Sequence, residues 1–256
     1  KGMPEHGLLV ACIDNGGVED VLKHAPQYIT YGLNDDALWR AENITYGETT
    51  VFDLIHDGQK VIQLETKLLG SHNVQNIVGV AALLLTRELV TPEEFVAAIA
   101  EFSGVRRRLN KITNASKVPA YEGFGSSYEK ARAAIEAIKL HYPDKNQVVL
   151  FEPHTFSWRN RDALAWYDTV FKDVAEVLVF EPATQGADTH KQLTQQEIVE
   201  RTAASGVSTR GVHDEESVRD TLKSALSNNS VLLVLTSGNL HGVLDSLPNW
   251  LDTTFQ

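Results

Sequence analysis

The second half of the chain alternates between strand-like and helix-like segments, and this alternation leaves few folds open. Five short apolar segments predict strands: "VPAYE", "QVVLF", "EVLVF", "GVSTR" and "VLLVL". Helices are expected between and beside them, over residues 126–141, 161–172, 194–203 and 215–226. Strands that are separated by helices pair in parallel, with the helices packed on the faces of the sheet. The sequence therefore predicts an α/β domain with a mostly parallel sheet and helices on both of its faces.

The first half has a different order, because strand-like segments come first and two helices follow. The strands are expected within residues 8–13, 27–32, 38–46, 49–56 and 59–69. Between the last two, the dipeptide Asp57-Gly58 predicts a tight two-residue hairpin. One helix is expected over residues 73–88, and the next should end near Phe102.

Capping sequences mark where several of these helices begin. Ser71 is the expected N-cap of the helix over residues 73–88. A Ser or Thr that is followed three residues later by Glu predicts a capping box. Such pairs occur at Thr91/Glu94, Ser126/Glu129 and Thr194/Glu197.

The change of pattern places a domain boundary within "SGVRRRLN", residues 103–110. We expect residues 1–104 to form one domain and residues 105–256 a second. The first domain enters the strand "LLVACI" almost at once. We therefore expect it to be the later part of a larger domain whose beginning lies upstream of residue 1.

Composition excludes several classes of function. The 256 residues carry a formal net charge of −11, which argues against nucleic acid as a partner because phosphate backbones need a basic surface. Cys12 is the single cysteine, so a disulfide framework and a cysteine metal site are excluded. The histidines show no spacing typical of metal ligands, and no G-x-x-x-x-G-K-[ST] phosphate loop occurs. Without a signal peptide or a membrane-spanning apolar stretch, we expect a cytoplasmic protein with no membrane partner.

Ligands of parallel sheets bind at the carboxyl ends of the strands, and this rule selects four loops: "EGFGSS", "EPHTFSWRNR", "EPATQGADTH" and "TSGNLHG". In the second loop, His154, Arg159 and Arg161 suit an anionic ligand, because guanidinium groups bind carboxylate or phosphate bidentately. The other interpretation is a solvated loop with two surface arginines and a capping histidine. "TSGNLHG" could offer backbone N–H groups to an anion at a helix start.

A basic cluster, Arg106 to Arg108, lies at the domain boundary. It is either a solvated surface or a group that reaches a ligand held between the domains. In the second case an arginine would couple domain closure to ligand binding.

The segment "GSHNVQN" places three hydrogen-bonding side chains at the start of an apolar helix. Asn73 and Asn76 are three residues apart and share one face of the first turn, with His72 beside them. Carboxamides can donate and accept hydrogen bonds at once, as an adenine edge requires. Local capping and one buried asparagine would also explain them.

In their order, these motifs make the chain resemble the Mur ligase family, the ATP-dependent amide ligases of peptidoglycan synthesis. The family's G-x-H-N-x-x-N pattern stands here as "GSHNVQN", and its F-x-G-V-x-R-R hinge as "FSGVRRRL". "FEPHTFSWRNRDAL" resembles a loop of the UDP-N-acetylmuramate–alanine ligase branch, while "LTSGNLHGV" is more similar to that branch's peptide-recycling relative. The resemblance covers essentially the whole chain.

The resemblance implies that residues 1–104 are the C-terminal part of a central ATP-binding domain and that residues 105–256 are the Rossmann-like C-terminal domain. In such ligases a carboxylate of UDP-N-acetylmuramate takes a phosphoryl group from ATP, and an amine then attacks the acyl phosphate. ATP and Mg²⁺ are implied, with the main phosphate and metal site upstream of this chain. The chain alone is therefore expected to be inactive.

The resemblance also implies residue roles. His72, Asn73 and Asn76 would hold the adenine end of ATP, and Arg107 and Arg108 would meet the nucleotide phosphates. The second domain would bind the incoming amino acid or tripeptide. Its expected contacts are Glu122, Ser126, Ser127, His154 and Arg161, the last two toward a substrate carboxylate.

The chain departs from the branch after the first strand of the second domain. The branch usually has D-D-[YF]-[AG]-H-H-P there, and this chain has "YEGFGSSYE". Either a different amine component or a non-catalytic module that binds a nucleotide or peptide would fit this departure. The amine donor, the catalytic residues and the oligomeric state stay open.

Overall fold

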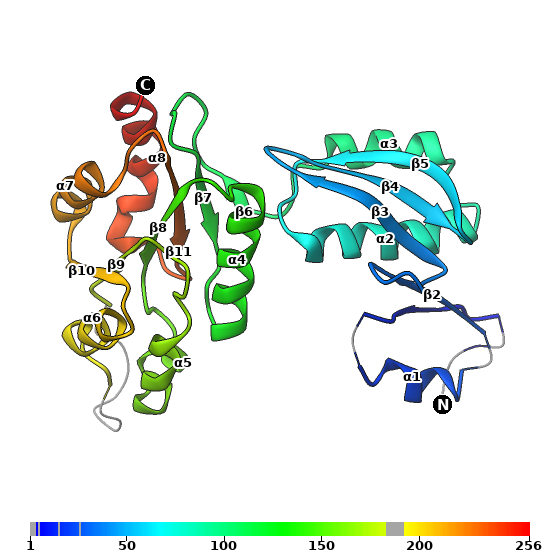
Figure 1. Ribbon diagram of the computed structural model, residues 1–256, viewed down its shortest axis with the longest axis horizontal. Helices are drawn as coiled ribbons and strands as arrows, with labels where there is room; N and C mark the ends of the chain where they lie inside the picture. The colour runs from blue at the N-terminus through cyan, green and yellow to red at the C-terminus, as the bar shows by residue number, and fades with distance from the viewer. Residues whose placement is uncertain (1–3, 5, 15, 26, 183–191) are drawn as a thin grey trace. The chain divides into compact units, whose positions relative to one another are not determined.

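The computed structural model describes residues 4, 6–14, 16–25, 27–182 and 192–256. The chain divides into two compact units, Lys1–Gly104 and Val105–Gln256 (Figure 1). Each unit has its own sheet and its own hydrophobic core. Among the described residues, none of the helices combines the length and the apolar character that a bilayer crossing requires.

The sheet of the first unit has the order β1-β2-β3-β4-β5 (Figure 1). Its strands are β1 (Leu9–Cys12), β2 (Tyr28–Gly32), β3 (Trp39–Tyr46), β4 (Thr50–His56) and β5 (Gln59–Thr66), with α1 (Val18–Leu22) after β1. The first three strands pair in parallel, and β3, β4 and β5 pair antiparallel. Asp57 and Gly58 have φ of 49° and 74°, as a tight turn with two left-handed residues requires, so the hairpin prediction is confirmed.

Two helices complete the first unit, α2 (Ser71–Thr86) and α3 (Pro92–Glu101). The apolar face of α2 buries Val74, Ile77, Val78, Ala81 and Ala82, which recur at the three- and four-residue spacing of a helix packed on one side. This face contacts β1, β2 and β3, while α3 contacts β5. The two helices therefore bury the apolar side chains of the sheet.

The predicted helix starts of this unit have different outcomes. The capping box between Thr91 and Glu94 is confirmed, with Pro92 at the first helical position. The N-cap prediction for Ser71 is wrong, because Ser71 is itself helical and the cap is Gly70. Gly70 has φ 90° and ψ 150°, a backbone conformation that residues with a Cβ seldom adopt, so the chain enters the helix one residue earlier.

The sheet of the second unit has the order β10-β9-β8-β11-β7-β6. Its strands are β6 (Arg108–Lys111), β7 (Ala120–Gly123), β8 (Asn146–Phe151), β9 (Glu176–Phe180), β10 (Ser208–Val212) and β11 (Ser230–Leu235). Every pairing is parallel except β6 with β7. The mostly parallel sheet is thus confirmed, and the end of the predicted boundary segment overlaps an edge strand, β6, that sequence analysis missed.

The helical segments of the second unit are α4 (Tyr128–His141), α5 (Phe156–Arg159), η1 (Arg161–Asp168), α6 (Gln195–Ala204), α7 (Glu215–Ala225), η2 (Leu240–Gly242) and α8 (Val243–Thr254) (Figure 1). The Thr194/Glu197 capping box of α6 is confirmed. The α-helix predicted over residues 161–172 is wrong, since η1 is a 3₁₀-helix that ends at Asp168. It lies against a cluster in which Trp158, Tyr167 and Phe171 surround Phe151 at the end of β8.

The cap predicted at Ser126 is also wrong by one residue. Ser127 is the N-cap of α4, and its hydroxyl accepts a hydrogen bond from Lys130 N at 3.4 Å. The carbonyl of Ser126 instead accepts hydrogen bonds from Thr155 and Ser157, whose hydroxyl oxygens lie at 3.0 and 3.1 Å. These contacts hold Ser126 outside the helix.

Candidate functional site at the strand ends of the second unit

Three loops meet where neighbouring parallel strands end. Leu235 of β11 is in register with Gly123 of β7 on one side and with Phe151 of β8 on the other. The loops "EGFGSS", "EPHTFSWRNR" and "TSGNLHG" therefore begin at the same edge of the sheet, as the strand-end rule predicts. The loop "EPATQGADTH" was selected by the same rule, and its residues 183–190 lie outside the described residues.

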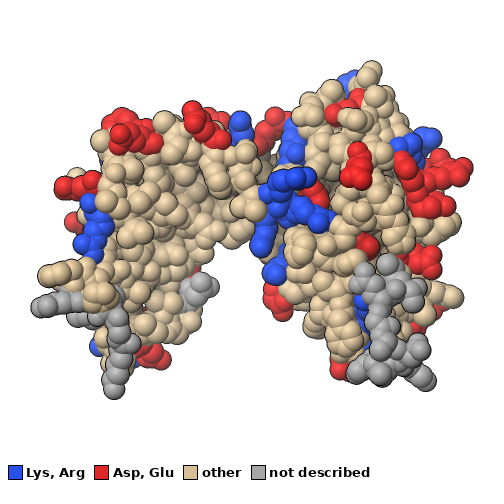
Figure 2. Space-filling model, turned by 180° about the vertical axis from the view of Figure 1, so that it is seen from behind, with Lys and Arg blue, Asp and Glu red and all other residues tan. Residues whose placement is uncertain are grey.

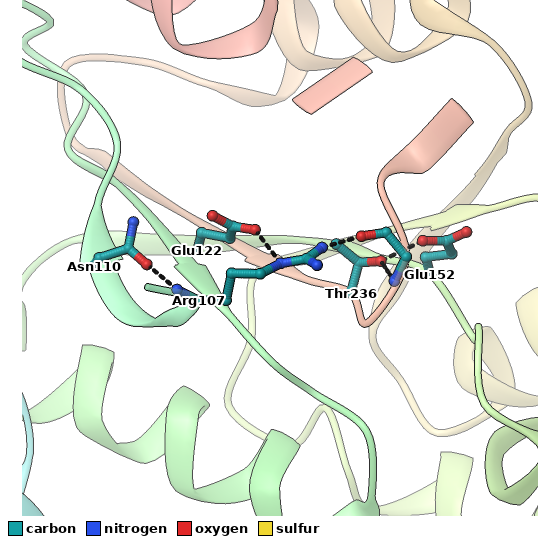
Figure 3. Close-up of polar contacts among 6 residues, drawn as sticks. Arg107, Asn110, Glu122, Glu152 and Thr236 are labelled. Atoms are coloured by element: carbon teal, nitrogen blue, oxygen red, sulfur yellow. Dashed lines mark hydrogen bonds and ion pairs between the residues drawn. The ribbon is translucent and has the colours of Figure 1, made fainter. Parts of the chain in front are cut away.

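A buried carboxylate lies at the centre of this edge. Glu152 follows β8 directly, and its side chain is 1% exposed. The hydroxyl of Thr236, the first residue after β11, donates to Glu152 Oε2 (Figure 3). Gly238 N in turn donates to Thr236 Oγ1 at 2.8 Å. The chain after β11 is thus hydrogen-bonded to the chain after β8.

His154 lies on the other oxygen of the same carboxylate. Its Nδ1 is 3.3 Å from Glu152 Oε1, and its side chain is 27% exposed. The loop after β11 closes over this pair, because a Cβ on Gly238 would lie 2.6 Å from Glu152 Oε2 and 2.7 Å from His154 Nδ1. Gly238 is therefore the residue that leaves room for the Glu152–His154 contact.

Arg107 contributes a cation to the edge. Its Nε donates to Glu122 Oε1 at 2.8 Å, and its Nη2 donates to the carbonyl of Gly238 (Figure 3). Its backbone N–H donates to Asn110 Oδ1 at 2.5 Å. Arg107 itself has φ 63°, a left-handed conformation uncommon for residues with a Cβ. The Asn110 contact supports that conformation and turns the side chain toward the strand ends.

The other two arginines of the predicted basic cluster, Arg106 and Arg108, are exposed. Figure 2 shows Lys and Arg side chains gathered on one side of the second unit, while Asp and Glu side chains are scattered over the rest of its visible surface. Only Arg107 among the three is turned onto the strand-end edge by contacts that the structure describes. The cluster is therefore not a uniform solvated surface.

The serines that were predicted to contact a substrate have structural contacts. The carbonyl of Ser126 joins the loop after β7 to the loop after β8, and Trp158 Nε1 adds a hydrogen bond to Gly125 O at 2.7 Å. Ser126 Oγ accepts from Lys130 Nζ at 3.1 Å. Ser127 caps α4. Through these contacts, Ser126 and Ser127 hold the loop that follows Glu122 and β7.

The structure separates the two predicted carboxylate contacts. Whereas His154 contacts Glu152, Arg161 forms an ion pair with Glu197 at 2.9 Å, and the Arg161 side chain is half exposed. The backbone N–H of Thr194 and the Arg161 guanidinium both lower the pKa of Glu197. Arg161 thus connects η1 to the start of α6. Arg159, the other arginine of this loop, is buried.

In the first unit, the predicted adenine contacts lie on the first turn of α2. Asn73 Nδ2 donates to the carbonyl of Leu69 at 2.8 Å, so this amide holds the loop that precedes the helix. His72 and Asn76 are exposed. The protein around the imidazole removes enough water to lower the pKa of His72 from its usual value, which favours the neutral ring at neutral pH.

Sequence analysis missed a second anchor of the same helix. Asp14, just after β1, accepts hydrogen bonds from Gln75 Nε2 at 2.6 Å and from Leu33 N at 2.7 Å. These bonds tie the first turn of α2 to the carboxyl ends of β1 and β2. The available signal was an aspartate just beyond an expected strand.

A metal site was not predicted within this chain. Among residues 4, 6–14, 16–25, 27–182 and 192–256, no group of three or more His, Cys, Asp or Glu side chains could hold a metal ion. The donors at the strand-end edge are instead paired with Arg107, Thr236 and His154.

Fold and site together define a two-unit α/β protein whose polar loops gather at the ends of parallel strands. Residues 1–84 match the Mur ligase middle domain. A UDP-N-acetylmuramate–L-alanine ligase of Ruthia magnifica subsp. Calyptogena magnifica is 31% identical over 258 aligned residues, which cover 96% of this chain and 54% of that protein. The chain belongs to the Mur ligase family.

Solved structures agree with the fold. A UDP-N-acetylmuramate–alanine ligase from Thermotoga maritima superposes with a TM-score of 0.72 at 18% identity, covering 96% of this chain and 52% of that one. The MurF ligase of Thermotoga maritima in complex with ADP gives a TM-score of 0.70 at 14% identity, covering 97% and 55%. This chain spans about half the length of the curated relatives that it matches.

Proposed function

We propose that this chain is the C-terminal portion of an ATP-dependent ligase that joins an amino acid or peptide to UDP-N-acetylmuramate in peptidoglycan synthesis or recycling. The observation that carries the proposal is the 31% identity to an L-alanine ligase, which extends over 96% of this chain. L-Alanine is the first amine to test, and the peptide L-alanyl-γ-D-glutamyl-meso-diaminopimelate is the second. We place the reaction in the cytoplasm.

The first unit would hold the adenine end of ATP. The exposed side chains of His72 and Asn76 supply polar groups at the start of α2. Asn73 fixes the loop that precedes the helix through its hydrogen bond to the Leu69 carbonyl. A neutral imidazole and a carboxamide can each donate and accept hydrogen bonds, as an adenine edge requires. The donor set fits this part of the nucleotide, whereas we assign Mg²⁺ to residues outside this chain.

The second unit would bind the amine component at the strand-end edge. Glu122 and His154 lie at that edge, and Ser126 and Ser127 hold the loop between them. We include Arg161 as a contact farther along the same loop. Arg107 and Arg108 would meet nucleotide phosphates, which requires Arg107 to leave Glu122.

ATP, when bound, supplies the phosphoryl group that activates the substrate carboxylate. The amine then attacks the activated carbonyl carbon, the new C–N bond forms and phosphate leaves. The residues of this chain position the two reactants and balance charge, because little covalent chemistry falls to the protein in phosphoryl transfer. Arginine suits the balancing of phosphate charge, since its guanidinium binds phosphate oxygens bidentately.

The test uses the whole protein and the 256-residue chain side by side. Phosphate release would be measured with ATP, UDP-N-acetylmuramate and either L-alanine or the peptide as the amine. We expect the whole protein to release phosphate only when all three substrates are present, and the chain alone to be inactive. Turnover or tight ATP binding by the chain alone would contradict the assignment of the phosphate site to the remainder of the protein.

A second candidate is a non-catalytic module that binds a nucleotide or peptide. The observation that favours it is the structural use of Ser126 and Ser127, which stand where the UDP-N-acetylmuramate–alanine ligase branch usually has two histidines. The same assay decides between the two. Binding of nucleotide by the whole protein without phosphate release in any amine mixture would support the module.

A further inference from the structure

A hydrogen-bond chain with one direction runs through the strand-end edge. Thr236 Oγ1 accepts from Gly238 N at 2.8 Å, so the hydroxyl proton is available for Glu152 Oε2. An ionised carboxylate can only accept hydrogen bonds. Its other oxygen, Oε1, is 3.3 Å from His154 Nδ1. The proton of a neutral His154 therefore belongs on Nδ1, which leaves Nε2 as a hydrogen-bond acceptor.

Burial shows which end of this series of hydrogen bonds is enclosed by the protein and which end is accessible. The Glu152 side chain is 1% exposed, while that of His154 is 27% exposed. The closeness of Gly238 to both side chains leaves no space for the ring to move toward the loop after β11. Glu152 thus holds one ring nitrogen inside the protein, and the other nitrogen remains for a ligand.

The groups beside His154 favour a cation over an anion. Glu122 and Glu152 bring two carboxylates, and the Arg107 guanidinium offsets one of them. Glu122 and the carbonyl of Gly238 together already bind the positively charged side chain of Arg107. At His154 itself, a ligand carboxylate would meet an acceptor nitrogen beside the Glu152 carboxylate, whereas an ammonium group is complementary to both.

The geometry points to His154 as the acceptor of a hydrogen bond from the ammonium group of the incoming amine, and to Glu152 as the positioning residue that fixes the tautomer of His154. This inference rests on the proposed function, because it names the part of the amine component that the edge recognises. It replaces the sequence-based expectation that His154 contacts a substrate carboxylate, since Nε2 of this tautomer has no proton to donate.

The tautomer can be observed directly in the 256-residue chain. Nitrogen-15 NMR of the histidine rings at neutral pH should show a protonated Nδ1 and an unprotonated Nε2 for His154, whose signals are identified by their loss in His154→Gln. In Glu152→Ala the proton should move to Nε2. In Glu152→Gln the amide oxygen still accepts from Nδ1, so the original tautomer should return. A wild-type His154 with its proton on Nε2 would overturn the inference.

Ligand class is tested with two probes of the same size. L-Alaninamide carries an ammonium group at neutral pH, and isobutyramide has an uncharged methyl group in its place. Only the first should shift the His154 Nε2 signal, and Glu152→Ala should weaken that binding at least about tenfold. Asn239→Ala, an exposed residue of the same loop, should bind like the wild type. Equal responses to both probes, or a response to neither, would refute ammonium recognition.

These outcomes separate the inference from the proposed function. Ammonium binding by the chain without ligase turnover in the whole protein would leave the subsite intact and refute the ligase. Ligase turnover by the whole protein, together with a His154 proton on Nε2, would support the ligase and refute the ammonium subsite. If Glu152→Ala fails to fold, the wild-type tautomer and the comparison of the two probes still decide.

Discussion

Arg107 and Glu122 form an ion pair in which guanidinium Nε donates to carboxylate Oε1 across 2.8 Å. The pair joins the residue just before β6 to β7, so a side chain from the start of the second unit reaches the strand-end edge. The same guanidinium contacts the carbonyl of Gly238 after β11. Both contacts are made by the side chain, so their loss would leave the backbone pairing of β6 with β7 in place.

The first prediction concerns this arginine. Arg107→Ala in the whole protein should lower turnover at least about tenfold, equivalent to about 1.4 kcal/mol of transition-state stabilisation, because it removes the positive charge that we propose meets the nucleotide phosphates. Arg106→Ala is the matched control, since Arg106 is exposed, and it should retain the wild-type rate. Steady-state phosphate release measures both, and an unchanged rate in Arg107→Ala would remove this residue from the mechanism.

The second prediction concerns Gly238. Gly238→Ala would place a methyl group within 2.7 Å of both Glu152 Oε2 and His154 Nδ1, and such overpacking costs about 1–3 kcal/mol. Urea denaturation of the chain should show this loss of unfolding free energy in the second unit. Gly47→Ala, whose new Cβ would have its nearest neighbour at 3.8 Å, should be tolerated. Equal stability of the two variants would disprove the crowding.

The third prediction separates stability from binding on α2. Asn73→Ala leaves the buried carbonyl of Leu69 without its 2.8 Å donor, so the first unit should lose about 1 kcal/mol of unfolding free energy. Asn76→Ala, at an exposed position, should keep its stability within about 0.5 kcal/mol. In the whole protein, Asn76→Ala should weaken ATP binding in a calorimetric titration. Unaltered affinity would exclude Asn76 from the adenine contacts.

The fourth prediction is a pH dependence at the C-terminal helix. Burial alone would raise the pKa of Asp252, but hydrogen bonds from the backbone N–H groups of Ala115, Ser116 and Asn114 outweigh it and lower the pKa. A depressed folded-state pKa contributes stability above the unfolded value, about 3.9, and that stability is lost as the pH falls through the folded value.

Asp252→Asn should therefore be less stable than the wild type at pH 7, and the difference should shrink below about pH 4. Urea denaturation followed by tryptophan fluorescence measures this, because Trp158, Trp166 and Trp250 all lie in the second unit. Asp144→Asn, at an exposed position, is the control and should follow the wild type at every pH. A constant difference between Asp252→Asn and the wild type would contradict the carboxylate's role.

Much of the fold could be predicted because its signals are local. Alternating apolar segments gave the strands of both sheets, and Asp57-Gly58 gave the hairpin, since two left-handed residues favour that turn. The 3₁₀-helix η1 and the edge strand β6 were missed for a common reason. Both depend on tertiary contacts, namely the aromatic packing around Phe151 and the pairing with β7.

The site could be predicted only at the level of loops. Strand order at the carboxyl edge brings the loops together, but the contacts within it join residues far apart in sequence. Thr236 and Glu152 are separated by 84 positions, and Arg107 and Gly238 by 131. Such pairs depend on the register of β11 between its neighbours, which no local pattern encodes. The N-cap of α4 is Ser127 and not the predicted Ser126 for the same reason, because the contacts that hold Ser126 outside the helix come from Thr155 and Ser157, which are distant in sequence.

The tight fit of Gly238 against Glu152 and His154 has a consequence for how this edge can diverge. A side chain at position 238 would collide with both Glu152 and His154, so this position cannot enlarge unless the other two side chains become smaller or move. Substitutions that enlarge position 238 would have to be combined with changes at positions 152 and 154. A library that randomises positions 152, 154 and 238 together would therefore recover solutions that three separate single-position libraries cannot contain.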